Sequence, residues 1–153
     1  MKNLFSRVGY HYIPVSDIDK SIRWYTDHLG LKLISKFTDR GSNVAVLHYP
    51  HKNAIASLLI ETSDQNPLEI MRNGEAFPIA ALNCDDIEYT HHQLKEKGLN
   101  IGEIITLGNG EAKYFYFRDN EGNLLEAAWS IWDPKDEIKD EWQAEDANNL
   151  SLS

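Results

Sequence analysis

Two ionisable side chains lie on predicted strands whose other residues are mostly apolar. Glu126 alternates with Leu124 and Ala128, so its carboxylate is expected to share their face of a sheet. A carboxylate on an apolar inner face needs a compensating partner, and a metal ion or a cationic ligand would supply one. A reversed register would instead turn Glu126 toward solvent. His11 shares a face with Ile13 on another predicted strand, either as a site residue or as a packed, hydrogen-bonded core histidine.

Further candidates come from a strand end and from the aromatic residues. Glu61 ends a predicted strand over residues 56–61 and is either a site carboxylate or a solvated strand end. A register slip of one or two residues would bring Leu59 or Ile60 into its place. Aromatic side chains either pack in a core or at an interface, or they stack on a flat or cationic ligand. Tyr114, Tyr116 and Trp129 are the candidates for such stacking, and Asn83 either contacts a ligand or bonds to the nearby helix cap.

The elements that must position these residues occur twice. A predicted strand over residues 8–15 leads into a helix that is capped near Asp17 and ends at Gly30. A second strand over residues 77–83 leads into a helix that is capped by Asp85-Asp86 and ends at Gly98. Both the interval from Asp17 to Gly30 and that from Asp85 to Gly98 are thirteen residues, which sets an offset of 68 between the copies. Short strands are predicted after each glycine, over residues 31–37, 44–49 and 56–61, and over residues 100–107, 112–118 and 124–129.

The repeat predicts two βαβββ modules, at about residues 6–63 and 77–132, joined by a polar linker over residues 64–76. A module of roughly 65 residues could hardly sustain a core alone, so both are expected to form one domain over residues 1–132. The predicted class is α+β, with the strands of both modules in one eight-stranded, curved sheet or open barrel. Residues 133–153 are expected to form an acidic extension, with a short helix that starts at Asp133-Pro134 and then frays, or a solvated appendage.

Composition excludes several classes of partner. The chain has 153 residues with 15 basic and 24 acidic side chains, giving a net charge of −9. Nucleic-acid and anionic-membrane surfaces need clustered Lys and Arg, so neither partner is expected. The single Cys84 excludes a disulfide framework and a four-cysteine zinc site. Residues 1–7 hold no apolar stretch of signal-peptide length, and a cytoplasmic location is predicted.

Two stretches resemble a known superfamily. The first runs from His11, six residues before Asp17, through the sequence SIRWY at residues 21–25 to LGL at residues 29–31. The second is YFRDNEGNLLE at residues 116–126. Together they resemble the vicinal oxygen chelate superfamily, which includes glyoxalase I, bleomycin resistance proteins and extradiol dioxygenases. The resemblance covers about residues 6–132 and implies a central, open cavity lined by the strands of both modules, with the helices outside. The residues expected to line it are Ile79, Asn83, Tyr114, Tyr116 and Trp129.

The resemblance also implies a divalent-metal site on the first and last strands of each module. His11, Glu61 and Glu126 match three of its ligand positions. The remaining position is Ile79, six residues before Asp85, where the family usually has His. Isoleucine cannot coordinate a metal, and one histidine with two carboxylates is still a workable site for Zn, Ni, Co or Mn. This set differs from the two-histidine, one-carboxylate set that holds Fe(II) for oxygen chemistry.

Two functions follow from the resemblance. The first is a metal-dependent lyase or isomerase of the glyoxalase I type, in which Glu126 or Glu61 moves a proton next to a carbonyl. The alternative is a metal-free protein, like the bleomycin resistance members, that sequesters a small basic or planar compound. In that case Ile79 is an apolar wall and Glu126 a charge partner. Both functions imply a small-molecule ligand and a homodimer.

Overall fold

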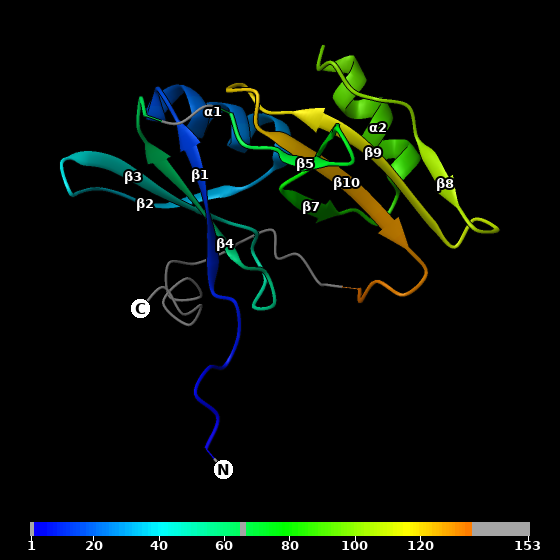
Figure 1. Ribbon diagram of the computed structural model, residues 1–153, viewed down its shortest axis with the longest axis horizontal. Helices are drawn as coiled ribbons and strands as arrows, with labels where there is room; N and C mark the ends of the chain where they lie inside the picture. The colour runs from blue at the N-terminus through cyan, green and yellow to red at the C-terminus, as the bar shows by residue number, and fades with distance from the viewer. Residues whose placement is uncertain (1, 65–66, 136–153) are drawn as a thin grey trace. The chain divides into compact units, whose positions relative to one another are not determined.

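The chain folds into two compact units, each with one helix packed on one face of a sheet (Figure 1). The structure is a computed structural model that describes residues 2–64 and 67–135. Within these ranges, unit 1 ends at Ser63 and unit 2 begins at Asp64. The eight strands predicted for the two modules lie in two four-stranded sheets, one in each unit. The predicted α+β class with two βαβββ modules is therefore confirmed.

Unit 1 contains β1 (Tyr10–Val15), α1 (Ile18–Leu29), β2 (Lys32–Asp39), β3 (Ser42–His48) and β4 (Ala56–Glu61). The strand order in its sheet is β1-β4-β3-β2, with β1 and β4 parallel and the other pairs antiparallel. The Asp17 side chain caps α1 by accepting a hydrogen bond from the backbone N–H of Lys20 at 3.1 Å. Gly30 ends the helix with a φ of +72°, a left-handed conformation that favours glycine.

The sheet of unit 1 has apolar residues on both faces. Helix α1 covers the face that contains Ile13 and Leu59, which are 1% and 0% exposed, and it buries Tyr25 there. The opposite face carries a second apolar cluster, formed by Val44, Val46, Ala56 and Leu58 with Tyr10, Ile34 and Ile60 packed against it. We call these the helix-covered face and the helix-free face. Alternation within each strand decides which face a side chain occupies.

Unit 2 contains β5 (Ile70–Arg72), β6 (Glu75–Phe77), β7 (Ala80–Asn83), α2 (Ile87–Glu96), β8 (Ile105–Leu107), β9 (Ala112–Arg118) and β10 (Leu124–Ser130). Its main sheet has the order β7-β10-β9-β8, which repeats the order of unit 1. The helix-covered face contains Phe115 and Leu125, which are 0% and 1% exposed. The ring of His91 on α2 packs edge-on against Phe115, with ring centroids 4.9 Å apart.

The structure corrects the alignment of the two modules by one residue at their first strands. Asp86, and not Asp85, caps α2, because its side chain accepts a hydrogen bond from the backbone N–H of Tyr89 at 3.0 Å. Asp86 therefore corresponds to Asp17, and the offset at this point is 69 residues, since 86 minus 17 is 69. As a result Ile79 corresponds to Tyr10, whereas the sequence had predicted that it corresponds to His11.

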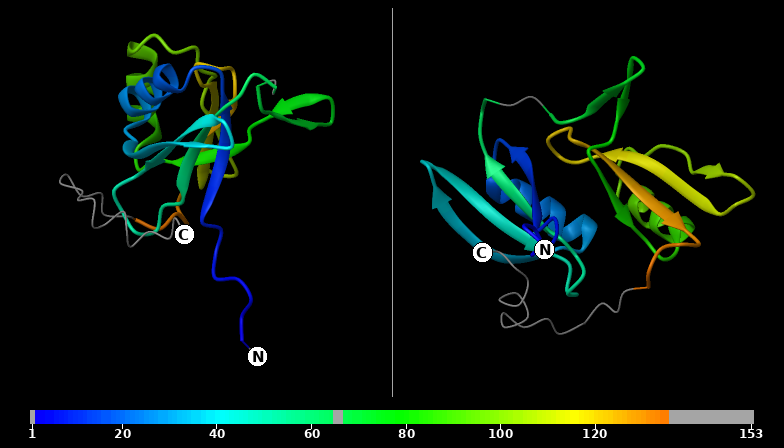
Figure 2. Two further views of the ribbon diagram at one scale, coloured as in Figure 1. Left: turned by 90° about the vertical axis from the view of Figure 1, so that its left-hand side faces the viewer. Right: turned by 60° about the horizontal axis from the view of Figure 1, so that its bottom comes forward.

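The segment predicted as a linker contains a β-hairpin. Strands β5 and β6 pair antiparallel, with Arg72 opposite Glu75. Asn73 and Gly74 form the turn with φ values of +52° and +81°, the signature of a type I′ turn. The hairpin belongs to unit 2 and stands out from the main sheet of that unit (Figure 2).

Residues 136–153 of the C-terminal extension lie outside the described residues, and with them lies most of the short helix that the sequence predicts from Asp133-Pro134 onward. At its start, Asp133 accepts hydrogen bonds from the backbone N–H and the Oγ of Ser130, at 2.8 and 2.7 Å. None of the helices in the described ranges has the length and apolar character needed to cross a membrane.

Candidate functional site

His11 lies on the helix-covered face of unit 1. It is the cross-strand partner of Ser57, and its Nε2 lies 2.7 Å from the Ser57 Oγ. Burial lowers the pKa of the His11 imidazole, because removal from water disfavours the charged form. These contacts are those of a packed, hydrogen-bonded histidine next to a core.

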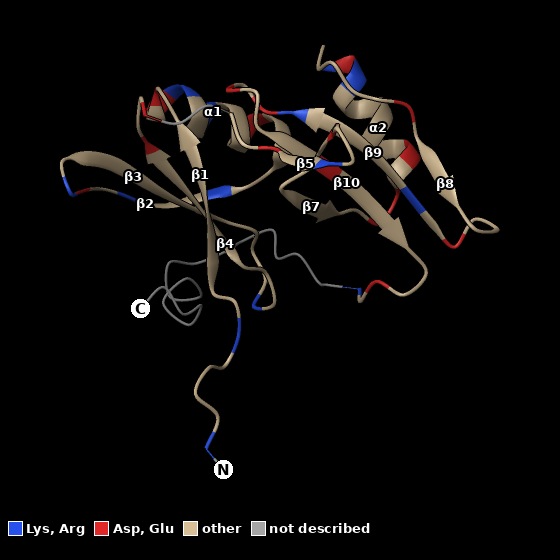
Figure 3. Cartoon of the chain, in the orientation of Figure 1, with Lys and Arg blue, Asp and Glu red and all other residues tan. Residues whose placement is uncertain are grey.

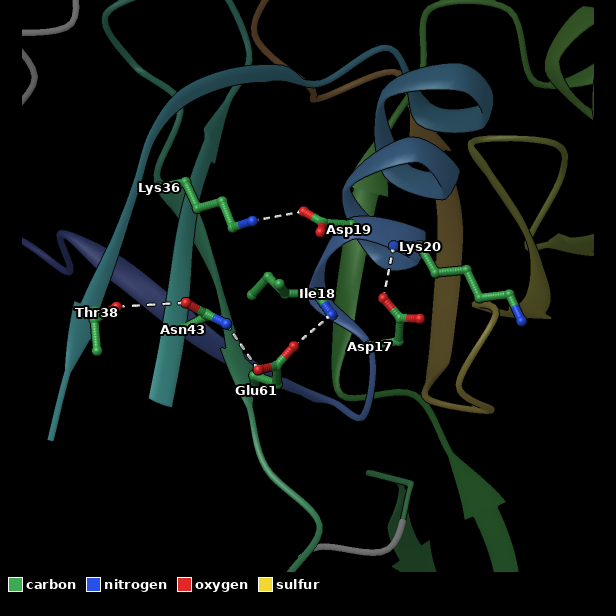
Figure 4. Close-up of polar contacts among 8 residues, drawn as sticks. All are labelled: Asp17, Ile18, Asp19, Lys20, Lys36, Thr38, Asn43 and Glu61. Atoms are coloured by element: carbon green, nitrogen blue, oxygen red, sulfur yellow. Dashed lines mark hydrogen bonds and ion pairs between the residues drawn. The ribbon is translucent and has the colours of Figure 1, made fainter. Parts of the chain in front are cut away.

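Glu61 shares the helix-covered face and both of its carboxylate oxygens accept hydrogen bonds (Figure 4). The Oε2 accepts from the backbone N–H of Ile18, the first residue of α1, at 2.9 Å. The Oε1 accepts from the Nδ2 of Asn43, also at 2.9 Å. A carboxylate at this position stabilises the positive end of the helix dipole. Glu61 thus joins β3, β4 and α1.

The structure does not bring His11 and Glu61 together. Glu61 is the partner of Val15 in the parallel pairing of β1 and β4, and His11 is the partner of Ser57, four residues away along each strand. Four residues of strand span about 13 Å. The two side chains are therefore too far apart to bind one ion.

Glu126 lies on the helix-free face of unit 2, in the middle of a strand that is otherwise uncharged (Figure 3). Its cross-strand partners are Tyr116 on β9 and Ala81 on β7. The side chain is partly buried, and this desolvation raises the pKa of the Glu126 carboxyl. Within residues 2–64 and 67–135, no hydrogen bond or ion pair to its carboxylate is found.

Two tyrosine rings lie beside Glu126 on the same face. Tyr114 and Tyr116 are tilted by 33° to each other, with centroids 5.4 Å apart. Burial is the main cause that raises the pKa of the Tyr116 phenol, and the nearby Tyr114 and Glu126 add to it. Asn83, the cross-strand partner of Ala128, is exposed on this face. The residues on the helix-free face of unit 2 include Ile79, Ala81, Asn83, Tyr114, Tyr116, Leu124, Glu126 and Ala128.

Trp129, which the sequence placed among the cavity residues, lies on the helix-covered face of unit 2. The Lys113 Nζ lies 5.8 Å from the centroid of its indole ring. Lys113 also pairs with Glu88 of α2. Trp129 therefore lies on the helix-covered face, on the opposite side of the sheet from Glu126.

Sequence reasoning missed two residues that extend the aromatic surface of unit 2. The ring of Phe77 on β6 lies 6.2 Å from the ring of Tyr116. The Arg72 Cζ on β5 lies 5.0 Å from the centroid of Phe77. The Asn73-Gly74 turn signal between these two residues could have identified the hairpin that carries them.

The predicted Zn, Ni, Co or Mn ligand set does not fit these positions. His11 and Glu61 are engaged with Ser57, Asn43 and α1 on the helix-covered face of unit 1. Glu126 is on the helix-free face of unit 2, where its sheet neighbours are aromatic or aliphatic. Among the residues that the structure describes, no three His, Cys, Asp or Glu side chains are placed to hold a metal ion.

Comparison with known proteins agrees with this fold. The family model described as the Glyoxalase/Bleomycin resistance protein/Dioxygenase superfamily matches residues 7–127. The uncharacterized protein YwbC of Bacillus subtilis (strain 168) is 30% identical over 122 residues, which are 78% of this chain and 94% of the relative. A probable lactoylglutathione lyase of Vibrio parahaemolyticus serotype O3:K6 is 24% identical over 121 residues, which are 78% of this chain and 88% of the relative.

A solved structure supports the same architecture. TnmS3, an antibiotic binding protein from Streptomyces sp. CB03234, superposes with a TM-score of 0.66 at 19% sequence identity. The match covers 84% of this chain and 99% of TnmS3. At this level of identity the similarity establishes a shared fold.

Proposed function

The chain belongs to the glyoxalase/bleomycin resistance protein/dioxygenase superfamily, and from this premise we propose that it is a metal-free binding protein for a small, basic and planar compound. The ligand binds on the helix-free face of unit 2. Glu126 supplies the negative charge, and the rings of Tyr114 and Tyr116 supply the stacking surface.

The observation that carries this proposal is the partly buried carboxylate of Glu126, to which no described residue donates a hydrogen bond or forms an ion pair. Burial raises the pKa of the Glu126 carboxyl, because partly removing a negative charge from water is unfavourable. A cationic ligand would offset that cost and displace water from the two tyrosine rings at the same time. Ile79 and Ala81 on the neighbouring β7 contribute apolar surface to the same face.

The similarity to TnmS3 points in the same direction, since that protein is described as an antibiotic binding protein. Antibiotics of many classes combine planar rings with basic groups, which is the chemistry that Glu126 and the tyrosines would recognise. We therefore infer sequestration of such a compound, with one ligand bound per chain.

A second candidate is an enzyme that moves a proton next to a carbonyl, as a lyase or isomerase does. The similarity to a probable lactoylglutathione lyase favours it. In this case Glu126 is the general base. Burial raises its pKa toward neutral pH, and a general base is most effective when its pKa lies near the working pH. Members of the superfamily commonly bind divalent metals, but Glu61 and His11 are not placed to hold one here.

The proposal is tested with two planar tricyclic probes, proflavine, which is cationic at neutral pH, and acridone, which is uncharged. Isothermal titration measures the dissociation constant of each probe in buffer with and without a chelator. We expect proflavine to bind more tightly than acridone, with no effect of the chelator. Glu126→Gln should weaken proflavine binding about ten-fold, since a hydrogen bond to a charged group contributes roughly 1.5 kcal/mol or more.

Glu61→Gln is the matched control, because it makes the same change on the helix-covered face of unit 1. We expect it to leave proflavine affinity unchanged. Equal affinity for proflavine and acridone, or equal loss in both variants, would contradict the proposed function. Binding that appears only after addition of Mn, Co, Ni or Zn would favour the enzyme candidate.

A further inference from the structure

We propose that the β5–β6 hairpin forms a second wall of the ligand site, on which Arg72 binds an anionic group of the ligand. This inference rests on the proposed function and narrows its ligand class. The preferred ligand is then amphoteric: a planar aromatic compound with a basic group for Glu126 and an acidic group for Arg72.

The hairpin is joined to the site by a continuous row of aromatic rings. The row starts at Tyr114, passes through Tyr116 at 5.4 Å and reaches Phe77 at 6.2 Å between ring centroids. The guanidinium of Arg72 lies over the Phe77 ring, with its Cζ 5.0 Å from the centroid. The Phe77 ring is inclined by 73° to the Tyr116 ring, so it forms a wall beside a flat ligand that stacks on Tyr114 and Tyr116. Such a ligand meets Glu126 beside Tyr116 and Arg72 on the Phe77 wall.

The start of the hairpin is fixed to the main sheet of unit 2 by the turn between β9 and β10. The Oδ1 of the fully buried Asn123 accepts a hydrogen bond from the backbone N–H of Leu68 at 2.7 Å. The backbone N–H of Leu124 donates to the Leu68 carbonyl at 2.9 Å. Glu69 pairs with Arg118 of β9 at 3.2 Å. A segment held by these bonds can present a side chain at a defined position beside the sheet.

The end of the hairpin is fixed as well. Phe77 packs against Tyr116, and the backbone N–H of Ile79 donates to the Leu124 carbonyl at 3.0 Å. Both ends of the hairpin therefore attach at the start of β10, two residues before Glu126. Hydrogen bonds at both ends therefore tie the hairpin to the strand that carries the Glu126 carboxylate.

Arg72 is available for a ligand. It is exposed, and within the described ranges no carboxylate forms an ion pair with it. Glu75 is its cross-strand neighbour, but the guanidinium lies over Phe77 instead. Stacking on an aromatic face leaves the edge N–H donors of arginine free to bind an anion such as a carboxylate. Arg118 on β9 is a further cation of unit 2, but it already forms an ion pair with Glu69.

The test uses two dyes that differ in a single group. Rhodamine 110 carries a planar cationic xanthene and a free carboxylate, and rhodamine 123 is its methyl ester. Fluorescence anisotropy gives the affinity of the full-length protein for each dye. We expect a preference of about three-fold to five-fold for rhodamine 110, the range for an exposed ion pair, and a smaller preference at high salt.

In Arg72→Gln the preference for rhodamine 110 should fall to about one. Arg23→Gln removes an exposed arginine from α1 of unit 1 and is the matched control, in which the preference should persist. A preference that survives in Arg72→Gln, or its absence from the wild-type protein, would overturn the assignment of Arg72. If both rhodamines bind in a way that depends on Glu126 but with equal affinity, the proposed function stands and this inference fails. If proflavine and both rhodamines fail to bind, both fail.

Discussion

The two units share one strand order, but the same positions on their helix-free faces carry different chemistry. In unit 1, Val46 and Leu58 are cross-strand partners on β3 and β4. In unit 2, the partners at the corresponding positions of β9 and β10 are Tyr116 and Glu126. Leu58 is 8% exposed and belongs to an apolar cluster, whereas Glu126 is a partly buried carboxylate.

The centres of the helix-covered faces are apolar in both units, and these faces differ at their ends, where Glu61 of unit 1 corresponds to Trp129 of unit 2. Ala45 of unit 1 and Phe115 of unit 2 occupy corresponding positions, and both are 0% exposed. At the centre of the sheet the helix-covered face is thus a core in both units, while the helix-free face is a second core in unit 1 and a polar, aromatic surface in unit 2. The comparison teaches that the repeat alone does not locate the site, and that one copy can supply stability while the other supplies recognition.

The largest expected effect comes from exchanging the residues that distinguish the units. Leu58→Glu places an unpaired charge in an apolar cluster and should lower the free energy of unfolding by about 3 kcal/mol or more. Glu126→Leu removes a desolvated charge and should leave that free energy equal or higher. Urea denaturation of both variants measures the difference. Equal destabilisation by the two exchanges would mean that the faces are not distinct.

A smaller effect is expected from removing one ring of the stacking surface. Tyr116→Val introduces the residue type found at Val46 in unit 1, and proflavine affinity should fall about five-fold through loss of an aromatic contact. Tyr12→Val is the control, since Tyr12 is a 55% exposed tyrosine on the helix-free face of unit 1. Fluorescence titration compares the two. A similar loss of affinity in Tyr12→Val would argue against a site on unit 2.

Glu61→Gln should lower stability modestly and leave ligand affinity unchanged. The amide oxygen of glutamine can still accept one hydrogen bond, but the negative charge at the start of α1 is lost. We expect the free energy of unfolding to fall by about 0.5–1 kcal/mol. Thermal denaturation with proflavine titration checks both readouts. A loss of ligand affinity without a loss of stability would show that Glu61 acts in binding.

The smallest effects are expected from pH, and they have opposite signs in the two units. Burial lowers the pKa of His11 and of His48 in unit 1, so the folded state disfavours their protonation. The stability from these groups is present above the ordinary histidine pKa and is lost as the pH falls through the lowered values. Burial raises the pKa of Glu126 in unit 2, so its contribution is present at low pH and is lost as the pH rises through the raised value.

Hydrogen exchange followed by mass spectrometry resolves the two units along the chain. After correction for the intrinsic pH dependence of exchange, peptides from β1 and β3 should lose protection as the pH falls below the ordinary range of histidine. Peptides from β10 should gain protection in Glu126→Gln at neutral pH, and this gain should vanish at low pH. A parallel pH response of both units would contradict the assignment of these groups.

Much of the fold could be predicted from the sequence because its signals are local. Asp17, Gly30 and the alternation of apolar residues mark the first helix and its strands, and the structure has them at those places. The paired Asp85-Asp86 offered two possible caps, and only the hydrogen bond to Tyr89 identifies which one is used. The predicted homodimer and cytoplasmic location stay predictions.

The candidate site was harder to predict, because alternation groups residues by face but does not say which face a helix covers. In unit 1 both faces are apolar, so the side occupied by His11 and Glu61 could not be read from the pattern. For Glu126 the alternation grouped the correct neighbours, Leu124 and Ala128, on one face. The Phe77–Tyr116 contact depends on the path of the β5–β6 hairpin, and most of this segment had been predicted to be a linker.

The most direct test of a site on unit 2 is an amide chemical-shift map of proflavine binding, recorded on the full-length, isotope-labelled protein. We predict that the largest shifts fall in β7, β9 and β10, centred on Glu126 and Tyr116, with one proflavine bound per chain. The largest shifts in β1 and β4, around His11 and Glu61, would contradict the account and return the site to unit 1.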